Sequence, residues 1–312
     1  MKGLFSIGVL CFQLIYTPIF AQSVTVASVS ITVRDIEAES KFFTEVLSFK
    51  KVLDTIVTDE QTLNTYGLNK ETKLQYVILS LGGESIKLLK FIGVTGRAYP
   101  ADSRSNDLWF QHIAIVVKDM DKAYAGLLDH QVNHISTSPQ TLPAYLPNAG
   151  GIKAFYFSDP EGHPLELIYF PPGKGHPKWQ HGTTDRIFLG IDHTAIAVSN
   201  TYKSKSFYEN LGLHQAGHSE NYGTEQEHLN QVFGARLDIN GFTSGKGIGV
   251  EFLRYISPGG GRPFPVDSKP WDLWFYQTEI QYSDDSTSFN QHLVKDPDGH
   301  SVLLIKSKSH QE

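Results

Sequence analysis

The sequence predicts an α+β fold made of four strand-helix-strand-strand-strand modules, arranged as two tandem copies of two modules each. Three observations support this prediction. The 312-residue chain repeats itself at a spacing of about 165 residues, which is the separation of Asp107 and Asp272. Each copy shows the module pattern twice, and a stretch rich in proline and glycine separates the copies. Self-similarity at a fixed spacing indicates duplication and is read before any local motif.

The repeat consists of matching segments that keep the same order with gaps of about one residue. Because the order never changes, duplication of an ancestral unit accounts for the pattern. The matching segments are Val29–Val33 with Thr194–Val198, Ser40–Leu47 with Ser204–Leu211, Ile86–Phe91 with Val250–Tyr255, Gly96–Pro100 with Gly261–Pro265, and Asp107-Leu108-Trp109-Phe110 with Asp272-Leu273-Trp274-Phe275.

Hydrophobic periodicity predicts the elements of each module. In the first module we expect a strand at Val26–Val33, a helix at Ile36–Leu47, and strands near Lys50–Ile56, Gln75–Leu81 and Ser85–Phe91. The pattern then restarts with a strand at Gln111–Val117, a helix at Met120–Leu128, and strands at Ile152–Phe157 and Pro164–Phe170. The fourth module is predicted to be truncated, because the segment between Tyr282 and Asp296 is too short for both a helix and a strand.

These patterns divide the chain into a signal peptide (1–21), a first domain (22–172), a linker (173–187) and a second domain (188–312). The stretch between the two copies reads Pro171-Pro172-Gly173-Lys174-Gly175-His176-Pro177. Proline lacks a backbone donor and glycine is flexible, so this segment is predicted not to form a strand.

The N-terminus has the features of a secretory signal. Met1-Lys2 supplies a positive start, Leu4–Phe20 is mostly apolar, and Ala21 offers a small residue at the cleavage point. The alternative is a membrane anchor, but Gln13 interrupts the stretch and leaves it shorter than a bilayer span requires. We therefore expect a periplasmic or secreted protein that is not membrane-bound after cleavage. Cleavage would remove Cys11, the only cysteine, so cysteine-based catalysis is excluded.

The charge of the chain bears on its partners. The formal net charge is -6, and the sequence contains no basic run. A surface of this kind repels phosphate groups, so nucleic acid is not expected as a partner.

Three segments resemble the vicinal-oxygen-chelate superfamily, which includes glyoxalase I, extradiol dioxygenases and fosfomycin-type resistance proteins. They are Gln111-His112-Ile113-Ala114-Ile115-Val116-Val117, Asp159-Pro160-Glu161-Gly162-His163-Pro164-Leu165-Glu166-Leu167, and Ile191-Asp192-His193-Thr194-Ala195-Ile196-Ala197-Val198. The resemblance implies two tandem glyoxalase-like domains in which pairs of modules form curved mixed sheets, each shaped like a cup. It also implies that each module offers one metal ligand from its first strand and one from its last.

The ligand positions of that family are filled in only two of the four modules. The second module has His112 and Glu166, and the third has His193 and Glu251. The first module has Ser28 and Lys87 and the fourth has Gln277 and Leu303 at these positions. Pairing the modules within each copy would give two half-sites, whereas pairing the second module with the third gives one complete site. We favour the second arrangement, because it separates one complete site from one structural cup.

The implied ligand set is His112, Glu166, His193 and Glu251. Two neutral imidazoles and two carboxylates carry a charge of -2, which would neutralise one divalent ion and leave about two coordination positions for water or substrate. This nitrogen and oxygen set suits Ni, Co, Zn, Mn or Fe. Taken singly, each residue is more typical of an exposed strand edge, so the hypothesis depends on their coincidence. One chain supplies the whole set, so a monomer is sufficient.

The resemblance implies a metal-dependent enzyme of glyoxalase I type, a lyase or isomerase, that acts on a small molecule with two adjacent oxygens. The metal would act as a Lewis acid, and Glu166 or Glu251 would carry a proton between neighbouring carbons. Two alternatives remain at this point. One is an extradiol-type dioxygenase, and the other is a non-catalytic protein that binds a small molecule. Arg97 and Arg262 follow glycines in equivalent loops, where structural turn contacts are expected.

Overall fold

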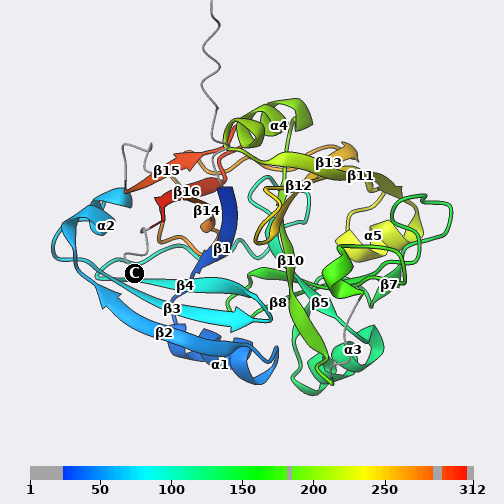
Figure 1. Cartoon of the computed structure of the whole chain (residues 1–312), viewed down its shortest axis with the longest axis horizontal. Coiled ribbons are helices and arrows are strands. Elements are labelled where there is room, and N and C mark those ends of the chain that lie inside the picture. Colours follow the sequence, from blue (N-terminus) through cyan, green and yellow to red (C-terminus); the bar gives the residue numbers. More distant parts are fainter. Residues whose placement is uncertain (1–23, 181–184, 284–289, 308–312) are drawn as a thin grey trace, which may run out of the picture.

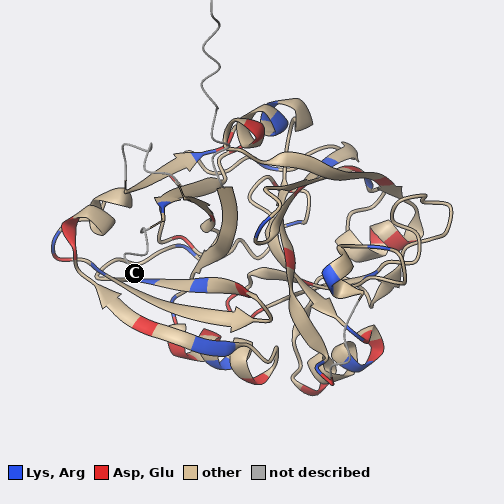
Figure 2. Ribbon diagram, in the orientation of Figure 1, with Lys and Arg blue, Asp and Glu red and all other residues tan. Residues whose placement is uncertain are grey.

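The computed structural model describes residues 24–180, 185–283 and 290–307. The predicted signal peptide and Cys11 lie outside these residues. Two open, curved sheets lie side by side in the view of Figure 1, and buried residues of both belong to one main hydrophobic core. In the view of Figure 2, Lys and Arg are scattered among Asp and Glu along both sheets. Within the described residues, no helix has the length and apolar character needed to cross a membrane.

The chain forms its elements in four successive modules. The first contains β1 (Val24–Thr32), α1 (Ile36–Glu45), β2 (Lys50–Val57), α2 (Glu60–Thr65), β3 (Lys73–Leu81) and β4 (Glu84–Ile92). The second contains β5 (Gln111–Val117), α3 (Met120–Asp129), β6 (Asn133–His134), β7 (Gln140–Thr141), β8 (Lys153–Ser158) and β9 (Pro164–Tyr169). The third contains β10 (Phe188–Ala197), α4 (Thr201–Asn210), β11 (His214–Tyr222), α5 (Thr224–Asn230), β12 (Arg236–Thr243) and β13 (Gly249–Ser257). The fourth contains β14 (Tyr276–Tyr282), β15 (Gln291–Lys295) and β16 (Ser301–Lys306).

The predicted α+β fold class is confirmed, with three differences in detail. The short helices α2 and α5 were not predicted. In the second module, the strand that should follow the helix is reduced to the two-residue strands β6 and β7. The linker contains a 3₁₀ turn at Pro177–Trp179, whose side chains pack onto the rest of the molecule.

Each sheet takes one module from each sequence copy. Sheet A has the order β15-β16-β14-β1-β4-β3-β2 and combines the first and fourth modules. Sheet B has the order β11-β12-β13-β10-β5-β9-β8-β6, with β7 beside β8, and combines the second and third. The modules meet through the antiparallel pairs β1–β14 and β10–β5, whereas β5–β9 and β10–β13 are parallel. The predicted pairing of the second module with the third is confirmed.

Strand alternation separates the core from the site on β5. Ile113, Ile115 and Val117 enter the main hydrophobic core, which the helices help to cover. His112 and Ala114 point to the opposite, concave face of sheet B, because successive side chains of a strand lie on opposite faces. Both are fully buried. The concave face is therefore the place where this sequence puts its polar ligand candidates.

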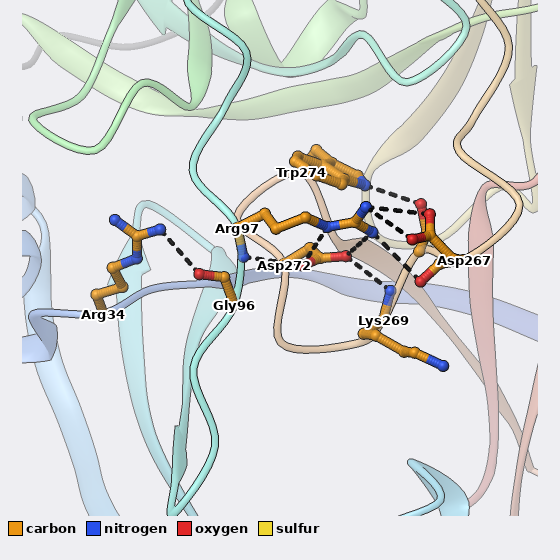
Figure 3. A network of polar contacts seen from close by, with 8 residues as sticks. Arg34, Gly96, Arg97, Asp267, Lys269, Asp272 and Trp274 are labelled. Atoms are coloured by element: carbon orange, nitrogen blue, oxygen red, sulfur yellow. Dashed lines mark hydrogen bonds and ion pairs between the residues drawn. The ribbon is translucent and has the colours of Figure 1, made fainter.

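Two equivalent arginine clusters join the sequence copies. Arg97, in the loop after β4, donates from Nε and from its backbone N to Asp272 Oδ1, at 3.1 and 2.9 Å, and from Nη2 to Oδ2 at 2.7 Å (Figure 3). Its Nη1 also binds both carboxylate oxygens of Asp267, at 3.0 and 3.2 Å. The guanidinium lies 4.7 Å from the ring centroid of Trp274. We call this group of side chains the Arg97 clamp.

The same contacts recur around Arg262, in the loop after β13. Arg262 binds Asp107 through Nε and Nη2, at 3.1 and 2.7 Å, and Asp102 through Nη1 at 3.0 Å. Its guanidinium lies 4.7 Å from the ring centroid of Trp109. We call this group the Arg262 clamp. The expectation that Arg97 and Arg262 make structural turn contacts is confirmed.

Candidate metal centre

The site is built on two rows of residues that run across adjacent strands of sheet B. In one row, Ala195 on β10 lies between Glu251 on β13 and His112 on β5. In the other, Ala114 on β5 lies between His193 on β10 and Glu166 on β9. Small alanine side chains in the middle of each row leave space between the four larger side chains. The sheet register therefore brings all four predicted ligand residues to one face.

His112, Glu166 and His193 form the centre of the site. Glu166 Oε2 lies 3.0 Å from His112 Nε2 and 3.6 Å from His193 Nε2. Within the described residues, these are the only three His, Cys, Asp or Glu side chains whose ligand atoms all lie within 4.8 Å of one another. All three are buried. This compact His-Glu-His cluster spans three neighbouring strands and both sequence copies.

Glu251 lies at the edge of this cluster. Its Oε1 is 3.7 Å from His193 Nε2, but no Glu251 oxygen comes within 4.8 Å of all three other ligand atoms. Its side chain is 26% exposed, compared with 5% for Glu166. Burial raises the pKa of Glu251 to about 7, against the opposing effect of His193. Glu251 as a fourth ligand stays a prediction, since its carboxylate would have to turn toward the centre.

His193 is oriented by the residue that precedes it. β10 has a bulge between Ile191 and His193, so Asp192 and His193 both reach the site side. His193 Nδ1 lies 3.0 Å from Asp192 Oδ2, while Asp192 Oδ1 accepts a hydrogen bond from the Trp179 indole in the linker. Because hydrogen bonds and the nearby positive charge lower the pKa of Asp192 against burial, this carboxylate is ionised and accepts from Nδ1. His193 Nε2 then faces the cluster.

The pKa values of the two imidazoles shift in opposite directions. Burial lowers the pKa of His112. Burial would do the same at His193, but Glu251, Asp192 and Glu166 raise the pKa of His193 to about 10. Without a bound cation, the carboxylates around His193 thus hold a proton on its ring. A metal ion that binds there would replace this proton, since imidazole must be neutral to act as a ligand.

The residues fit a metal ion. Neither ring nitrogen of His112 has a hydrogen-bond partner among the described residues, and the same holds for His193 Nε2. His112 Nε2 is close to Glu166 but not aligned with it for a hydrogen bond. A buried polar group without a partner costs about 1–3 kcal/mol. Two imidazoles and a carboxylate that point to a common centre are a donor set used by Zn, Fe, Ni and Co sites.

Sheet A carries the equivalent positions with different chemistry. Glu279 on β14, in the place of Ala114, points into the region that the metal ligands surround in sheet B. Lys87 Nζ, from the position of Glu251, binds both Glu279 oxygens at 2.7 and 2.9 Å. Ser30 and Gln277 also donate to Glu279. Ser28, Lys87, Gln277 and Leu303 occupy the predicted ligand positions. Glu279, which was not predicted from the sequence, fills this cup and forms an internal ion pair with Lys87.

Two cavities meet at the centre. The inner cavity has a volume of about 120 Å³ and lies between the cluster and helix α5, lined in part by Glu166, His193 and Glu251. The outer cavity has a volume of about 700 Å³ and is lined in part by His176, Lys178, His193 and Glu251. His193, Glu251 and Asp192 line both cavities. A small molecule could therefore reach the cluster from the outer cavity and extend into the inner one.

Sequence comparison finds a family match over the first of the two sequence copies. Residues 25–167 match the family model described as Glyoxalase/Bleomycin resistance protein/Dioxygenase superfamily. No curated protein sequence matches the chain. The family match confirms the resemblance to the vicinal-oxygen-chelate superfamily, and the four-module fold agrees with it.

Solved structures show the same fold over nearly the whole chain. Glyoxalase I from Zea mays is 16% identical with a TM-score of 0.57, and the match covers 91% of this chain and 93% of that one. A putative dioxygenase from Bacillus subtilis subsp. subtilis str. 168 is 13% identical with a TM-score of 0.52, covering 92% of this chain and 87% of that one. At these identities, the similarity establishes the fold alone.

Proposed function

We propose that this protein is a metal-dependent enzyme of glyoxalase type that acts on a small substrate with two adjacent oxygens. The observation that carries the proposal is the placement of Glu166 Oε2 at 3.0 and 3.6 Å from the Nε2 atoms of His112 and His193. A divalent ion held there would act as a Lewis acid toward a chelating substrate. The candidate ions are Ni, Co, Zn, Mn and Fe, and mass spectrometry of the purified protein would identify which one is bound.

The two glutamates are assigned different roles. Glu166 lies between both imidazoles and is buried, so it acts as a ligand. Glu251 is more exposed and lines both cavities at the edge of the cluster. A carboxylate in that position can reach a substrate carbon and carry a proton to its neighbour. Glu251 is therefore the proposed proton shuttle.

Metal stoichiometry tests the centre. We expect about one divalent ion per wild-type chain by mass spectrometry, and loss of that ion in both His112→Ala and His193→Ala. Gln277→Ala and Ser28→Ala change the equivalent positions of sheet A and serve as matched controls that retain it. Two ions per chain, each lost in only one histidine variant, would contradict a shared centre.

Proton transfer tests the chemistry. We expect the metal-loaded protein to exchange carbon-bound hydrogen of hydroxyacetone with D₂O, measured by proton NMR. Glu251→Gln should abolish the exchange while keeping the metal. If the wild type binds metal but shows no exchange with hydroxyacetone or larger hydroxy-ketones and dicarbonyls, a non-catalytic binding protein explains the site better.

A second candidate function is supported by the compactness of the cluster. Two histidines and one carboxylate without Glu251 match the facial triad of non-haem Fe(II) oxygenases. An extradiol-type dioxygenase would consume oxygen when the Fe(II)-loaded protein meets catechol. Oxygen uptake that survives in Glu251→Gln would favour this candidate, whereas oxygen-independent proton exchange would favour the first.

We also propose that the protein is exported and works as a monomer in the periplasm or outside the cell. The support is the apolar segment Leu4–Phe20 before Ala21, and the fact that a single chain supplies the whole cluster. N-terminal sequencing of the protein from periplasmic and culture fractions should find Gln22 as the first residue. A protein that keeps Met1 and stays in the cytosol would contradict export.

A further inference from the structure

The inner cavity has properties that define the part of a substrate it would accept. Its volume of about 120 Å³ corresponds to about four water molecules at roughly 30 Å³ each, so it accepts only a short group. Much of its wall is apolar and comes from both the second and the third module. The apolar contributors include Leu142, Ile152, Leu229 and Ile239.

The side-chain charges around this cavity are predominantly negative, although His193 also lines it. Glu166, Asp192 and Glu251 line it, and no Lys or Arg appears among its described lining residues. Lys178 lines the outer cavity, where its Nζ forms an ion pair with Glu84 Oε1 at 2.9 Å. With one divalent ion bound at the cluster, the three carboxylates still leave a net negative charge around the cavity, so an anionic group there would be desolvated in unfavourable surroundings.

Two buried amide side chains supply the polar part of the wall. Asn221, at the end of β11, is 4% exposed, and Gln226, on α5, is 1% exposed. Neither Asn221 Oδ1 nor Gln226 Oε1 has a hydrogen-bond partner among the described residues. Both residues line the inner cavity. Buried acceptors without a partner are rare in folded proteins, so these two oxygens point to a ligand that donates.

The orientation of the Gln226 amide is set by its neighbours. Its Nε2 donates to Asn230 Oδ1, and Asn230 Nδ2 donates to the hydroxyl of Tyr255 at 2.7 Å. This chain of donors ends in a buried tyrosine and holds the carbonyl of Gln226 as the free end of its amide. The acceptor is thus fixed in place before a ligand arrives.

We propose that the inner cavity is a subsite for a short, uncharged substrate arm that ends in a hydroxyl group. The adjacent oxygens of the substrate would lie at the His112–Glu166–His193 cluster, and the hydroxyl would donate to Asn221 or Gln226. The inference rests on the proposed metal-centred function and adds the substrate class. It excludes substrates whose inner arm carries a carboxylate or phosphate.

Three hydroxamic acids with matched chains test this assignment on the metal-loaded wild-type protein. Each presents two adjacent oxygens to the metal, and they differ only in the end of the arm. The arm ends in methyl in butyrohydroxamic acid, in hydroxyl in 3-hydroxypropionohydroxamic acid, and in carboxylate in succinic monohydroxamic acid. By calorimetric titration we expect the hydroxyl compound to bind about two- to tenfold tighter than the methyl compound, the range of one neutral hydrogen bond. The carboxylate compound should bind at least about tenfold weaker than the methyl compound.

Two variants locate the hydroxyl. The variant that removes the acceptor in use, Gln226→Leu or Asn221→Leu, should reduce the preference for hydroxyl over methyl toward one, with metal content unchanged in both. Gln61→Leu, on the exposed face of α2 in the first module, is the matched control and should keep the wild-type preference. If either cavity variant fails to fold, the wild-type ligand series and the other variant still decide the question.

The outcomes separate this inference from the proposed function. If metal binds and all three compounds bind equally, or the carboxylate compound binds tightest, the subsite is wrong and the metal centre stands. The subsite is also wrong if both cavity variants keep the hydroxyl preference. If the protein retains no metal and binds none of the compounds, the proposed function fails and the subsite fails with it.

Discussion

At the scale of single residues, the position of His193 depends on its neighbours in the chain and on the linker. Asp192 accepts from His193 Nδ1 and from the Trp179 indole, so one carboxylate ties a candidate ligand to the segment between the sequence copies. Partners of this kind fix the tautomer and ring orientation of a metal-binding histidine. The linker therefore contributes to the site and does more than connect two halves.

Asp192→Asn tests this role. An asparagine offers only one acceptor where two donors now bind, so His193 or Trp179 would lose its hydrogen bond. We expect metal affinity to fall about 10- to 100-fold, as measured by competition with a chelating dye. Asp121→Asn, at a position with an 84% exposed side chain on α3, is the control and should bind as the wild type does. If Asp192→Asn and Asp121→Asn bound the metal with equal affinity, Asp192 would not be needed to orient His193.

A second residue-scale prediction concerns Glu39, which is fully buried on α1. Burial and the nearby Asp159 and Glu161 carboxylates raise the pKa of Glu39 far above the usual carboxyl range. The folded protein thus binds a proton that the unfolded chain releases, so stability falls as pH rises above that range. Glu39→Gln should be more stable than wild type at pH 8, with a difference that shrinks toward pH 5.

Urea unfolding between pH 5 and pH 9 measures this effect. Glu37→Gln, on the exposed side of the same helix, should follow the wild-type pH dependence. A stability difference between Glu39→Gln and wild type that does not change with pH would rule out the protonated state of Glu39.

At the scale of elements, the two sheets have the same strand register but carry different side chains at the equivalent positions of their concave faces. In sheet B, alanines in the middle of both rows leave space for a cation among two histidines and two glutamates. In sheet A, the same positions hold Ser30 and Glu279, and Lys87 provides the positive charge. An ammonium group from the chain thus occupies the structural place that a metal ion would take in the other sheet.

Lys87→Met tests whether this ion pair stabilises sheet A. The change leaves Glu279, whose side chain is 5% exposed, without its cation. We expect the free energy of unfolding to fall by about 3–5 kcal/mol, the range for breaking a buried pair on one side. The double variant Lys87→Met/Glu279→Leu should recover most of the loss, because apolar replacement of both partners is often neutral. Metal content should be unchanged in both, and a loss of metal would show that the two sheets are coupled.

The sequence predicted the modules and the ligand rows because both depend on local alternation and on duplication. Ala114 and Ala195 mark the site already in the primary structure, since a core strand would carry larger residues there. The bulge at Asp192 was not predictable, because one extra residue in a strand leaves no periodic signal. The distance of Glu251 from the other ligands depends on its rotamer and on sheet curvature. Asn221 and Gln226 belong to no motif, and only the fold brings them to the cavity.

At the scale of the whole molecule, the Arg97 clamp and the Arg262 clamp join the copies at two equivalent places. Arg97→Ala and Arg262→Ala should each lower the free energy of unfolding by about 2–3 kcal/mol, because Asp272 and Asp107 are buried and lose charged hydrogen bonds. If the clamps are independent, the double variant should lose as much free energy of unfolding as the two single variants together. Urea denaturation measures all three.

The conservative variants refine this prediction. Lysine cannot form the paired contacts of a guanidinium, so Arg97→Lys and Arg262→Lys should recover little of the lost stability. Variants that unfold at the wild-type urea concentration would show that the clamps contribute nothing.

The exchange of modules between the copies has a consequence for how the chain becomes a folded molecule. β1 and β5 both lie in the first copy, and both find their antiparallel neighbours, β14 and β10, only in the second. While the ribosome has made no more than the first copy, two strand edges stand open, and such edges readily recruit other strands. Both edges acquire the neighbours seen in this structure only after the C-terminal half has been made. We therefore expect a gene cut within the linker to encode two fragments that complete each other's sheets only when they are produced together.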